Sequence, residues 1–374
     1  MKKKKKLKRL FLLLILIPIL FFITLFMPDT FMNTKYNNNY DFVQSTSITN
    51  MNARIIDIGI LGSHDSSTAG INMKSKPNSN ESGIITSGIV NKLAKGLVVR
   101  MSKTQTANIH DQLYAGTRYL DIRVTKIDDE YYTCHGYLSY KLEEVVVDVL
   151  EFLDTHPGEF IIFDIQAFYT KNGKDRELDD EEFIELYNYI NSIKSSNNST
   201  LSDYIRYDAN NDSIDSLTYG GITLNKTKAG LVILAKVDGI KELYYRDKDA
   251  SYKSYRIYYD IRSYWHETNS MKELMNGIKY ENEYIKEQGL NDVLRVNQAL
   301  RTGFFTNLKI IKSLFNWSLL NMAKTTNKKV IANKDDFMEW LNQMPIFLVD
   351  EVTSNVGNFN KLANEYIMEF NSKL

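Results

Sequence analysis

The amino-acid sequence predicts an α/β fold, a TIM-type (β/α) barrel in complete or distorted form, preceded by an N-terminal transmembrane helix. Three observations lead to this prediction. Apolar runs of strand length alternate with helical patterns, and several of these runs end in charged residues. The 374 residues are 43% hydrophobic and 25% charged. This composition is ordinary for a globular chain and supplies enough apolar mass for one large core.

The predicted elements follow one another along the chain. Five short apolar runs are strand candidates: residues 53–61, 118–124, 159–166, 230–237 and 345–352. Two longer runs, residues 139–158 and 179–193, repeat apolar side chains at helical spacing. Two polar stretches, 33–52 and 72–91, indicate a linker and a long surface loop. The repetition of strand, helix and strand favours a parallel sheet.

The alternation within one strand favours a barrel over a doubly wound sheet. In residues 118–124, Tyr119, Asp121 and Arg123 share one face and the residues between them are apolar. Both faces of a doubly wound sheet meet helices and should be apolar. The inner face of a barrel, in contrast, carries polar groups near its catalytic rim, where the strands end.

The same rim collects the candidate catalytic residues. His64 and Asp65 follow the first strand, and Asp350 ends the last one. The convergent set is His64, Asp65, Asp121, Arg123, His135 and Asp350, with Gln166, Lys236 and Asp260 as outer candidates. Two imidazoles beside a guanidinium suit the cleavage of a phosphodiester, because one ring removes a proton, the other donates one, and the cation holds the phosphoryl charge.

Each of these residues also has a purely structural interpretation. Asp121 and Arg123 could form a salt bridge inside the barrel, and Asp350 could cap the following segment. The aromatic cluster that ends in Tyr264 and Trp265 could stack on a sugar ring or pack in the core. His110, His156 and His266 are interpreted as turn or surface histidines.

The N-terminus predicts a membrane anchor. "MKKKKKLKRL" is strongly basic, and Leu10–Met27 is an apolar run of about 18 residues, roughly 27 Å as a helix. No small-x-small cleavage site follows it, so an uncleaved single-pass anchor is favoured over a cleaved secretion signal. The positive-inside rule then places the catalytic domain outside the cytoplasm. The predicted division is residues 1–30 for the basic N-terminus and anchor, 31–52 for a linker and 53–374 for the catalytic barrel.

The charge of the remaining chain excludes nucleic acid as a partner. The whole chain has 46 basic and 46 acidic residues. Without the seven basic residues before Leu10 it keeps 39 basic against 46 acidic residues, a formal charge of about −7. Binding of phosphate backbones requires a basic surface. We expect a membrane-anchored monomer whose partner is a membrane phospholipid.

Three sequence blocks together indicate a family. "LGSHDSST", "IHDQLYAGTRYLDIRV" and "CHGYLSYKLEEVVVDVLEFLDTHPGEFIIFDIQ" closely resemble the catalytic X region of phosphatidylinositol-specific phospholipase C. The likeness is greatest to the smaller bacterial-type enzymes and their X-domain-only relatives. It covers residues 55–166 well and the rest weakly.

The resemblance implies a role for each matching residue. His64 matches the general base that activates the inositol 2-hydroxyl, and Asp65 matches the neighbouring acid that supports the acid side. Arg123 matches the phosphate contact, and His135 the general acid toward the diacylglycerol oxygen. Asp350 matches the aspartate that orients the base. The implied products are diacylglycerol and an inositol cyclic phosphate.

The resemblance alone does not determine which lipid head group is bound or whether a metal ion is required. Calcium-dependent members carry ligands where this chain has Asp65 and Arg123, and a guanidinium there would repel a divalent cation. We therefore expect an enzyme without a metal or other cofactor. Asp121, Gln166, Lys236, Asp260, Tyr264 and Trp265 are the predicted substrate-binding residues. The alternatives are a metal-dependent glycerophosphodiester-type phosphodiesterase on the same barrel and a catalytically silent lipid-binding module.

Overall fold

The computed structural model describes most of the chain after residue 40. The described residues are 15–16, 18–19, 41–81, 88–170, 178–207, 212–235, 255–256, 261–303 and 318–374.

A single curled sheet organises the molecule. Its strand order is β7-β6-β5-β2-β1-β10-β9-β8, and every neighbouring pair along this path is parallel. The strands are β1 (Ile60–Ser63), β2 (Thr117–Ile127), β5 (Phe160–Tyr169), β6 (Gly230–Ala235), β7 (Tyr255–Arg256), β8 (Ile261–Tyr264), β9 (Leu294–Gln298) and β10 (Ile346–Val349). The described residues show no pairing between β7 and β8. Among the described residues, the sheet is a curled half-barrel that resembles a TIM-type barrel loosely.

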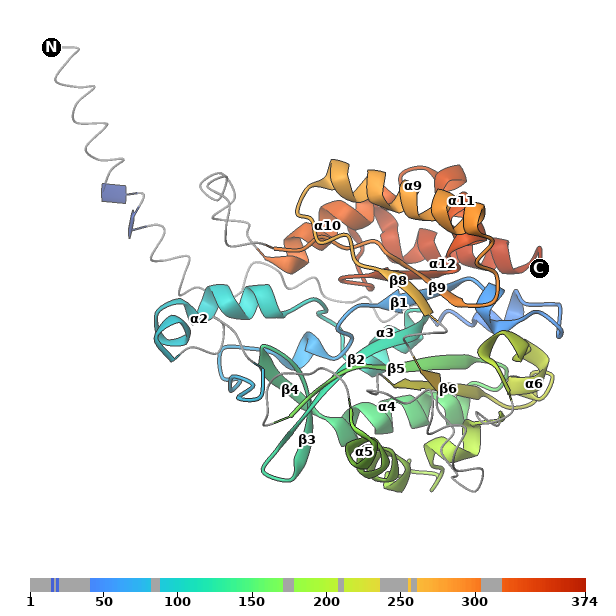
Figure 1. Cartoon of the computed structure of the whole chain (residues 1–374), viewed down its shortest axis with the longest axis horizontal. Coiled ribbons are helices and arrows are strands. Elements are labelled where there is room, and N and C mark those ends of the chain that lie inside the picture. Colours follow the sequence, from blue (N-terminus) through green and yellow to red (C-terminus); the bar gives the residue numbers. More distant parts are fainter. Residues whose placement is uncertain are drawn as a thin grey trace, which may run out of the picture.

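An antiparallel hairpin extends the sheet. β3 (Glu130–His135) pairs with β2, and β4 (Tyr137–Lys141) pairs with β3. This hairpin projects from the body beside β2 (Figure 1). The turn that joins β2 to β3 uses Asp128 and Asp129, both with positive φ, which aspartate tolerates in tight turns.

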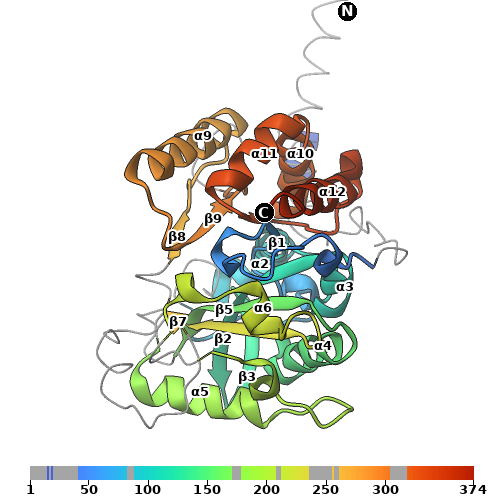
Figure 2. The same ribbon diagram turned by 90° about the vertical axis from the view of Figure 1, so that its right-hand side faces the viewer.

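Helices cover the sheet from two sides (Figure 2). One group lies on the side of β2, β5 and β6, and the C-terminal group lies on the side of β9 and β10. The helices are α2 (Gly88–Ser102), α3 (Ile109–Tyr114), α4 (Leu142–Thr155), α5 (Asp180–Ser192), α6 (Tyr219–Thr223), α9 (Met271–Gln288), α10 (Leu319–Val330), α11 (Lys334–Gln343) and α12 (Phe359–Asn371).

The core explains why these segments form these elements. Both faces of β6 are buried, as parallel strands between helices require. In α4, the predicted apolar stripe of Val145, Val149 and Leu153 is buried in the same cluster as β5 and β6. At the start of α5, Asp179 accepts a hydrogen bond from the Glu182 backbone at 2.8 Å and so caps the helix.

The first predicted strand is wrong over most of its length. Residues 55–57 form a 3₁₀ turn, and β1 begins only at Ile60. Ile55 donates its backbone N–H to Leu217, and the Arg54 side chain donates to Asp57 at 2.7 Å. The apolar run is buried as predicted, but local and loop hydrogen bonds satisfy its backbone instead of a neighbouring strand.

The predicted surface loop 72–91 is also partly wrong. Residues 76–81 dock on the β3–β4 hairpin, where Leu138 donates to the Lys76 carbonyl at 2.9 Å and Asn78 donates to the Gly136 carbonyl at 3.0 Å. The side chains of Asn78 and Asn80 are buried. Gly88 already starts α2.

Part of the predicted linker packs on the body. Ser45 donates its backbone N–H to Glu159 at 2.7 Å, and Arg118 donates to the Phe42 carbonyl at 2.9 Å. Arg118 and Glu159 form a fully buried ion pair at the start of β2 and of β5, at the opposite strand ends from the candidate residues. Ile48 is buried as well. The domain boundary at residue 53 stays a prediction.

The predicted membrane span, Leu10–Met27, lies outside the described residues apart from 15–16 and 18–19. In the part of the chain that the structure describes, no helix combines the length and the apolarity needed to cross a bilayer. The anchor and the extracytoplasmic location stay predictions.

Candidate active site

The catalytic candidates meet at the C-terminal ends of neighbouring strands. His64 and Asp65 follow β1, Arg123 lies on β2, His135 ends β3, and Asp350 follows β10. β1 lies between β2 and β10 in the sheet, so the curl of the sheet brings these side chains together.

His64 lies between a carboxylate and a guanidinium. Its Nδ1 is 2.8 Å from Asp350 Oδ1, and its Nε2 is 3.2 Å from Arg123 Nη2. A guanidinium only donates, so Nε2 accepts and the proton of the neutral ring is assigned to Nδ1. This is the tautomer that a general base requires, because Nε2 carries the lone pair that takes up a proton.

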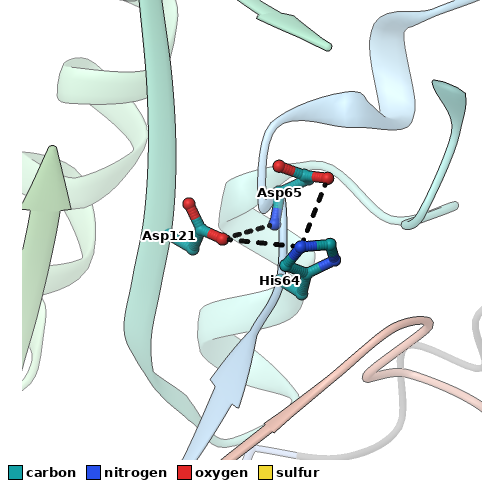
Figure 3. Close-up of side chains that lie close together, drawn as sticks. All are labelled: His64, Asp65 and Asp121. Carbon is teal, nitrogen blue, oxygen red and sulfur yellow. Dashed lines mark hydrogen bonds and ion pairs between the residues drawn. The ribbon is translucent and has the colours of Figure 1, made fainter. Parts of the chain in front are cut away.

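Asp65 links the two histidines and the arginine. One of its oxygens forms an ion pair with Arg123 Nε. The other lies 3.3 Å from His135 Nδ1 and 3.5 Å from His64 Nε2. Figure 3 shows how Asp65 and Asp121 flank His64. Asp65 has a positive φ, a strained conformation that the backbone hydrogen bond from its N–H to Asp121 Oδ2 helps to hold.

His135 presents its second nitrogen to the pocket. Its Nδ1 lies 3.0 Å from the Ser102 carbonyl, which only accepts, so Nδ1 carries the proton. Nε2 is left for a substrate atom. The imidazole of His135 lines the same pocket as that of His64.

The electrostatics favour a charged His64 in the absence of substrate. Burial lowers the pKa of His64, but Asp65, Asp350 and Asp121 outweigh it and raise that pKa to about 9. Burial also lowers the pKa of Arg123, yet Asp65 and Asp121 raise it well above its usual range. Burial raises the pKa of Asp350, although His64 opposes this effect. The hydrogen bond from Arg123 Nη2 to His64 Nε2 can form only when Nε2 carries no proton. This geometry therefore corresponds to neutral His64, the form that can accept a proton.

Thr104 and Gln105, in the segment between α2 and α3, fix the position of this cluster. Gln105 Nε2 donates to the carbonyls of His64 at 3.0 Å and Val349 at 3.1 Å, and Gln105 Oε1 accepts from Val352 N at 3.0 Å. Thr104 Oγ1 donates to the His64 carbonyl at 3.0 Å. The segment 104–105 thus ties the end of β1 to the end of β10. Nothing in the sequence pattern marks it.

A pocket of about 340 Å³ opens over these groups. Of the predicted substrate-binding residues, Asp121, Gln166 and Trp265 line it. Tyr264 does not; its side chain is half exposed and its ring packs against His266. Lys236 and Asp260 lie outside the described residues.

Further residues that sequence reasoning missed line the same pocket. Tyr119 projects from β2 and donates its hydroxyl to Asp164. Tyr119 shares a strand face with Asp121 and Arg123, and this alternation could have identified it as a pocket residue. Glu81 and Arg301 enter from loops, where no periodicity points to a side-chain direction.

The acidic groups also raise the question of a metal. His64, Asp65 and Asp121 place ligand atoms within 4.8 Å of one another. However, Arg123 Nε pairs with Asp65 and lies 3.7 Å from Asp121 Oδ1, and its Nη2 contacts His64. The guanidinium already supplies a positive charge to every member of this set, so the residues fit a divalent cation poorly.

Comparisons of the sequence with known proteins confirm the resemblance. No family model matches the chain. PI-PLC X domain-containing protein 2 from Homo sapiens is 32% identical over 135 residues, 35% of this chain and 44% of that protein. The Mus musculus protein of that name is 31% identical over 135 residues, 40% of its length. The variant-surface-glycoprotein phospholipase C of Trypanosoma cruzi is 30% identical over 141 residues, 33% of this chain and 37% of that protein. The chain therefore matches only about two fifths of the length of these relatives.

Solved structures share the fold over a much larger part of the chain. A mutant of the phosphatidylinositol-specific phospholipase C from Staphylococcus aureus matches with a TM-score of 0.59 and 16% identity, covering 88% of this chain and 97% of that chain. The enzyme of that name from Listeria monocytogenes matches with a TM-score of 0.52 and 16% identity, covering 88% and 98%. At these identities the likeness establishes the fold: a curled half-barrel sheet with helices around it.

Proposed function

We propose that this chain, similar to phosphatidylinositol-specific phospholipases C in sequence and fold, is a phospholipase C that cleaves phosphatidylinositol-type lipids without a metal. The observation that carries the proposal is the convergence of His64 and His135 on one pocket with Arg123 beside them. The two histidines share Asp65 as a partner. This arrangement supplies a base, an acid and a fixed cation around one phosphate.

The proposed reaction is an intramolecular displacement. His64 Nε2 removes the proton from the inositol 2-hydroxyl, and that oxygen forms a bond to phosphorus. The bond from phosphorus to the diacylglycerol oxygen breaks, and His135, which enters this step as the imidazolium with both nitrogens protonated, gives the proton on Nε2 to that oxygen and keeps the one on Nδ1. Arg123 holds the phosphoryl charge, while Asp350 keeps His64 in the required tautomer. Diacylglycerol and an inositol cyclic phosphate result, and water then opens the cyclic phosphate.

The test is a product assay on the full-length chain in detergent with vesicles that contain phosphatidylinositol. We expect inositol cyclic phosphate and diacylglycerol from the wild type, at a rate that EDTA leaves unchanged. His64→Ala and His135→Ala should each lower the rate by about 100-fold or more. His110→Ala, a histidine on the exposed face of α3, serves as the matched control and should keep the wild-type rate.

The remaining outcomes identify the alternatives. Activity abolished by EDTA and restored by a divalent cation would instead support a metal-dependent phosphodiesterase that uses His64, Asp65 and Asp121. Vesicle binding by the wild type without any product would support a lipid-binding module. A panel of phosphatidylinositol, phosphorylated phosphatidylinositols and glycosylated phosphatidylinositols in the same assay identifies the head group.

A further inference from the structure

Glu351 is a buried carboxylate that the proposed reaction does not use. It directly follows Asp350 after β10, is 1% exposed and is not among the residues that line the pocket. Its φ is +49°, a backbone conformation that costs a glutamate free energy and persists only where the surroundings hold it. The contacts of Glu351 therefore show which segments fix the chain after Asp350.

The segment between α2 and α3 holds Glu351 by three hydrogen bonds. Its two carboxylate oxygens accept from Thr106, one from the backbone N–H at 2.9 Å and the other from the hydroxyl at 2.6 Å. The backbone N–H of Glu351 donates to the Thr104 carbonyl at 2.8 Å. The two bonds from Thr106 go to a charged acceptor, and such bonds are stronger than those between neutral groups.

The same segment holds the histidine that Asp350 contacts. Thr104 and Gln105 both donate side-chain hydrogen bonds to the His64 carbonyl. Thr104 is 0% and Gln105 1% exposed. The end of β1 and the turn after β10 thus share one buried attachment, and Glu351 is its charged member.

Helix α10 holds the backbone of this turn as well. Asn327 Nδ2 donates to the Asp350 carbonyl at 2.9 Å and to the Glu351 carbonyl at 3.1 Å. With its backbone held in this way, Asp350 places its carboxylate 2.8 Å from His64 Nδ1. A displacement of about 1 Å would break that contact, because a hydrogen bond requires a distance near 3 Å.

We propose that Glu351 is a positioning residue, which fixes the turn after β10 through Thr106 and so keeps the Asp350 carboxylate on His64 Nδ1. The importance of this contact for lipid cleavage rests on the proposed function.

Two substitutions separate the hydrogen bonds of Glu351 from its charge. Glu351→Ala removes both bonds to Thr106. Glu351→Gln can keep both, because its amide oxygen accepts from the Thr106 backbone and its amide N–H donates to the Thr106 hydroxyl. Glu182→Ala is the control: Glu182 accepts the Asp179 backbone N–H at 3.1 Å at the start of α5 and does not line the pocket.

The first measurement is the titration of His64 by histidine NMR on the full-length chain in detergent without lipid, with the signal assigned by its loss in His64→Ala. The charged groups that face His64 are Asp350 at Nδ1 and Asp65, Asp121 and Arg123 at Nε2. Displacement of Asp350 removes one of the charges that favour the imidazolium. We therefore expect the midpoint to fall by about 1 pH unit or more in Glu351→Ala, and to stay at the wild-type value in Glu351→Gln and Glu182→Ala.

The second measurement is lipid cleavage. Glu351→Ala should lower kcat by about 10-fold or more with little change in KM, because the general base loses its orientation while the pocket lining is kept. When Asp350→Asn is already present, Glu351→Ala should lower kcat no further, since both changes remove the same contact. A merely structural role would give losses that add.

Thermal melting shows which variants fold. If Glu351→Ala does not fold, Thr106→Val, which removes only the hydroxyl donor, should shift the His64 midpoint in the same direction by a smaller amount. An unshifted midpoint in every folded variant, an equal shift in Glu351→Gln, or losses that add to those of Asp350→Asn would overturn the positioning role. A shifted midpoint in a chain that cleaves no lipid would overturn the proposed function and leave the role of Glu351 standing.

Discussion

His64 is controlled by the charges around it. Asp350 holds Nδ1, and Asp65, Asp121 and Arg123 surround Nε2. The carboxylates raise the pKa of His64 to about 9. In the proposed reaction His64 acts as a general base and must be neutral, so we expect the active fraction to increase as the pH rises toward this value.

Asp350→Asn tests this control. We expect kcat/KM to fall by about 100-fold, since Asn no longer fixes the tautomer of His64. Asp350 raises the pKa of His64, so its loss should move the acidic limb of the kcat/KM profile from near pH 9 toward lower pH. The measurement is a pH–rate profile for wild type and variant. An acidic limb that stays in place, or that moves to higher pH, would contradict the role given to Asp350.

The sequence predicted that most of the candidate residues would meet in one pocket, because each lies at the end of a strand or within a recognisable block. The polar parity of Tyr119, Asp121 and Arg123 depends only on strand geometry, and all three line the pocket. Glu81 could not be found this way, since its position depends on the contacts of Asn78 and Asn80 with residues far along the chain.

At the scale of elements, α12 is locked to the turn before β2. Asn364 Nδ2 donates to the Ala115 carbonyl at 2.9 Å, and Gln44 Nε2 donates to the Gly116 carbonyl at 2.8 Å. Gly116 has φ +93°, and a Cβ there would lie 2.0 Å from Asn364 Oδ1. The close approach of helix and turn requires glycine at this position.

Gly116→Ala should therefore lower the free energy of unfolding by about 3 kcal/mol or more, from the strained φ together with the clash. Gly289→Ala is the matched control: Gly289 caps α9 with φ +61° but has no atom within 4 Å of the added Cβ. We expect it to lose only about 1 kcal/mol. Denaturant unfolding measures both. Equal losses would show that the contact with Asn364 is unimportant, whereas partial recovery by adding Asn364→Gly would support it.

The sequence predicted elements well where periodicity was strong and poorly where it was short. The helices α4 and α5 lie within the predicted runs, because an apolar stripe over several turns has one interpretation. β8 and β9 were missed. Both strands are short, and each contains a charged residue where an apolar one would have signalled a strand. Arg295 in β9 forms an ion pair with Asp57, and Arg262 in β8 forms one with Glu281.

At the scale of the whole molecule, residues 42–48 belong to the packed body. Removal of residues 1–40 gives the reference truncation, because it keeps every contact that the structure describes for residues 42–48, and its melting temperature is the reference value. Removal of residues 1–48 should lower it by about 5 °C or more, because the buried pair of Arg118 and Glu159 loses the Phe42 and Ser45 contacts and the buried Ile48 is lost. Differential scanning calorimetry of the two truncations decides; equal melting temperatures would contradict the contribution of this segment.

The attachment of residues 42–45 to the body fixes the side on which the N-terminal segment enters, relative to the pocket. Phe42 and Ser45 attach beside the first residues of β2 and β5, whereas the pocket opens where β1, β2 and β10 finish. If the residues before Asp41 were anchored in a bilayer, the chain would enter the body on the side opposite the pocket. The pocket would then open away from that bilayer. Residues 28–40, fully extended, reach roughly 45 Å. Cleavage of lipids in the anchoring bilayer would require residues 28–40 to let the body rotate until its pocket reaches that bilayer. Lipids in an opposing membrane would be accessible to the pocket without this rotation.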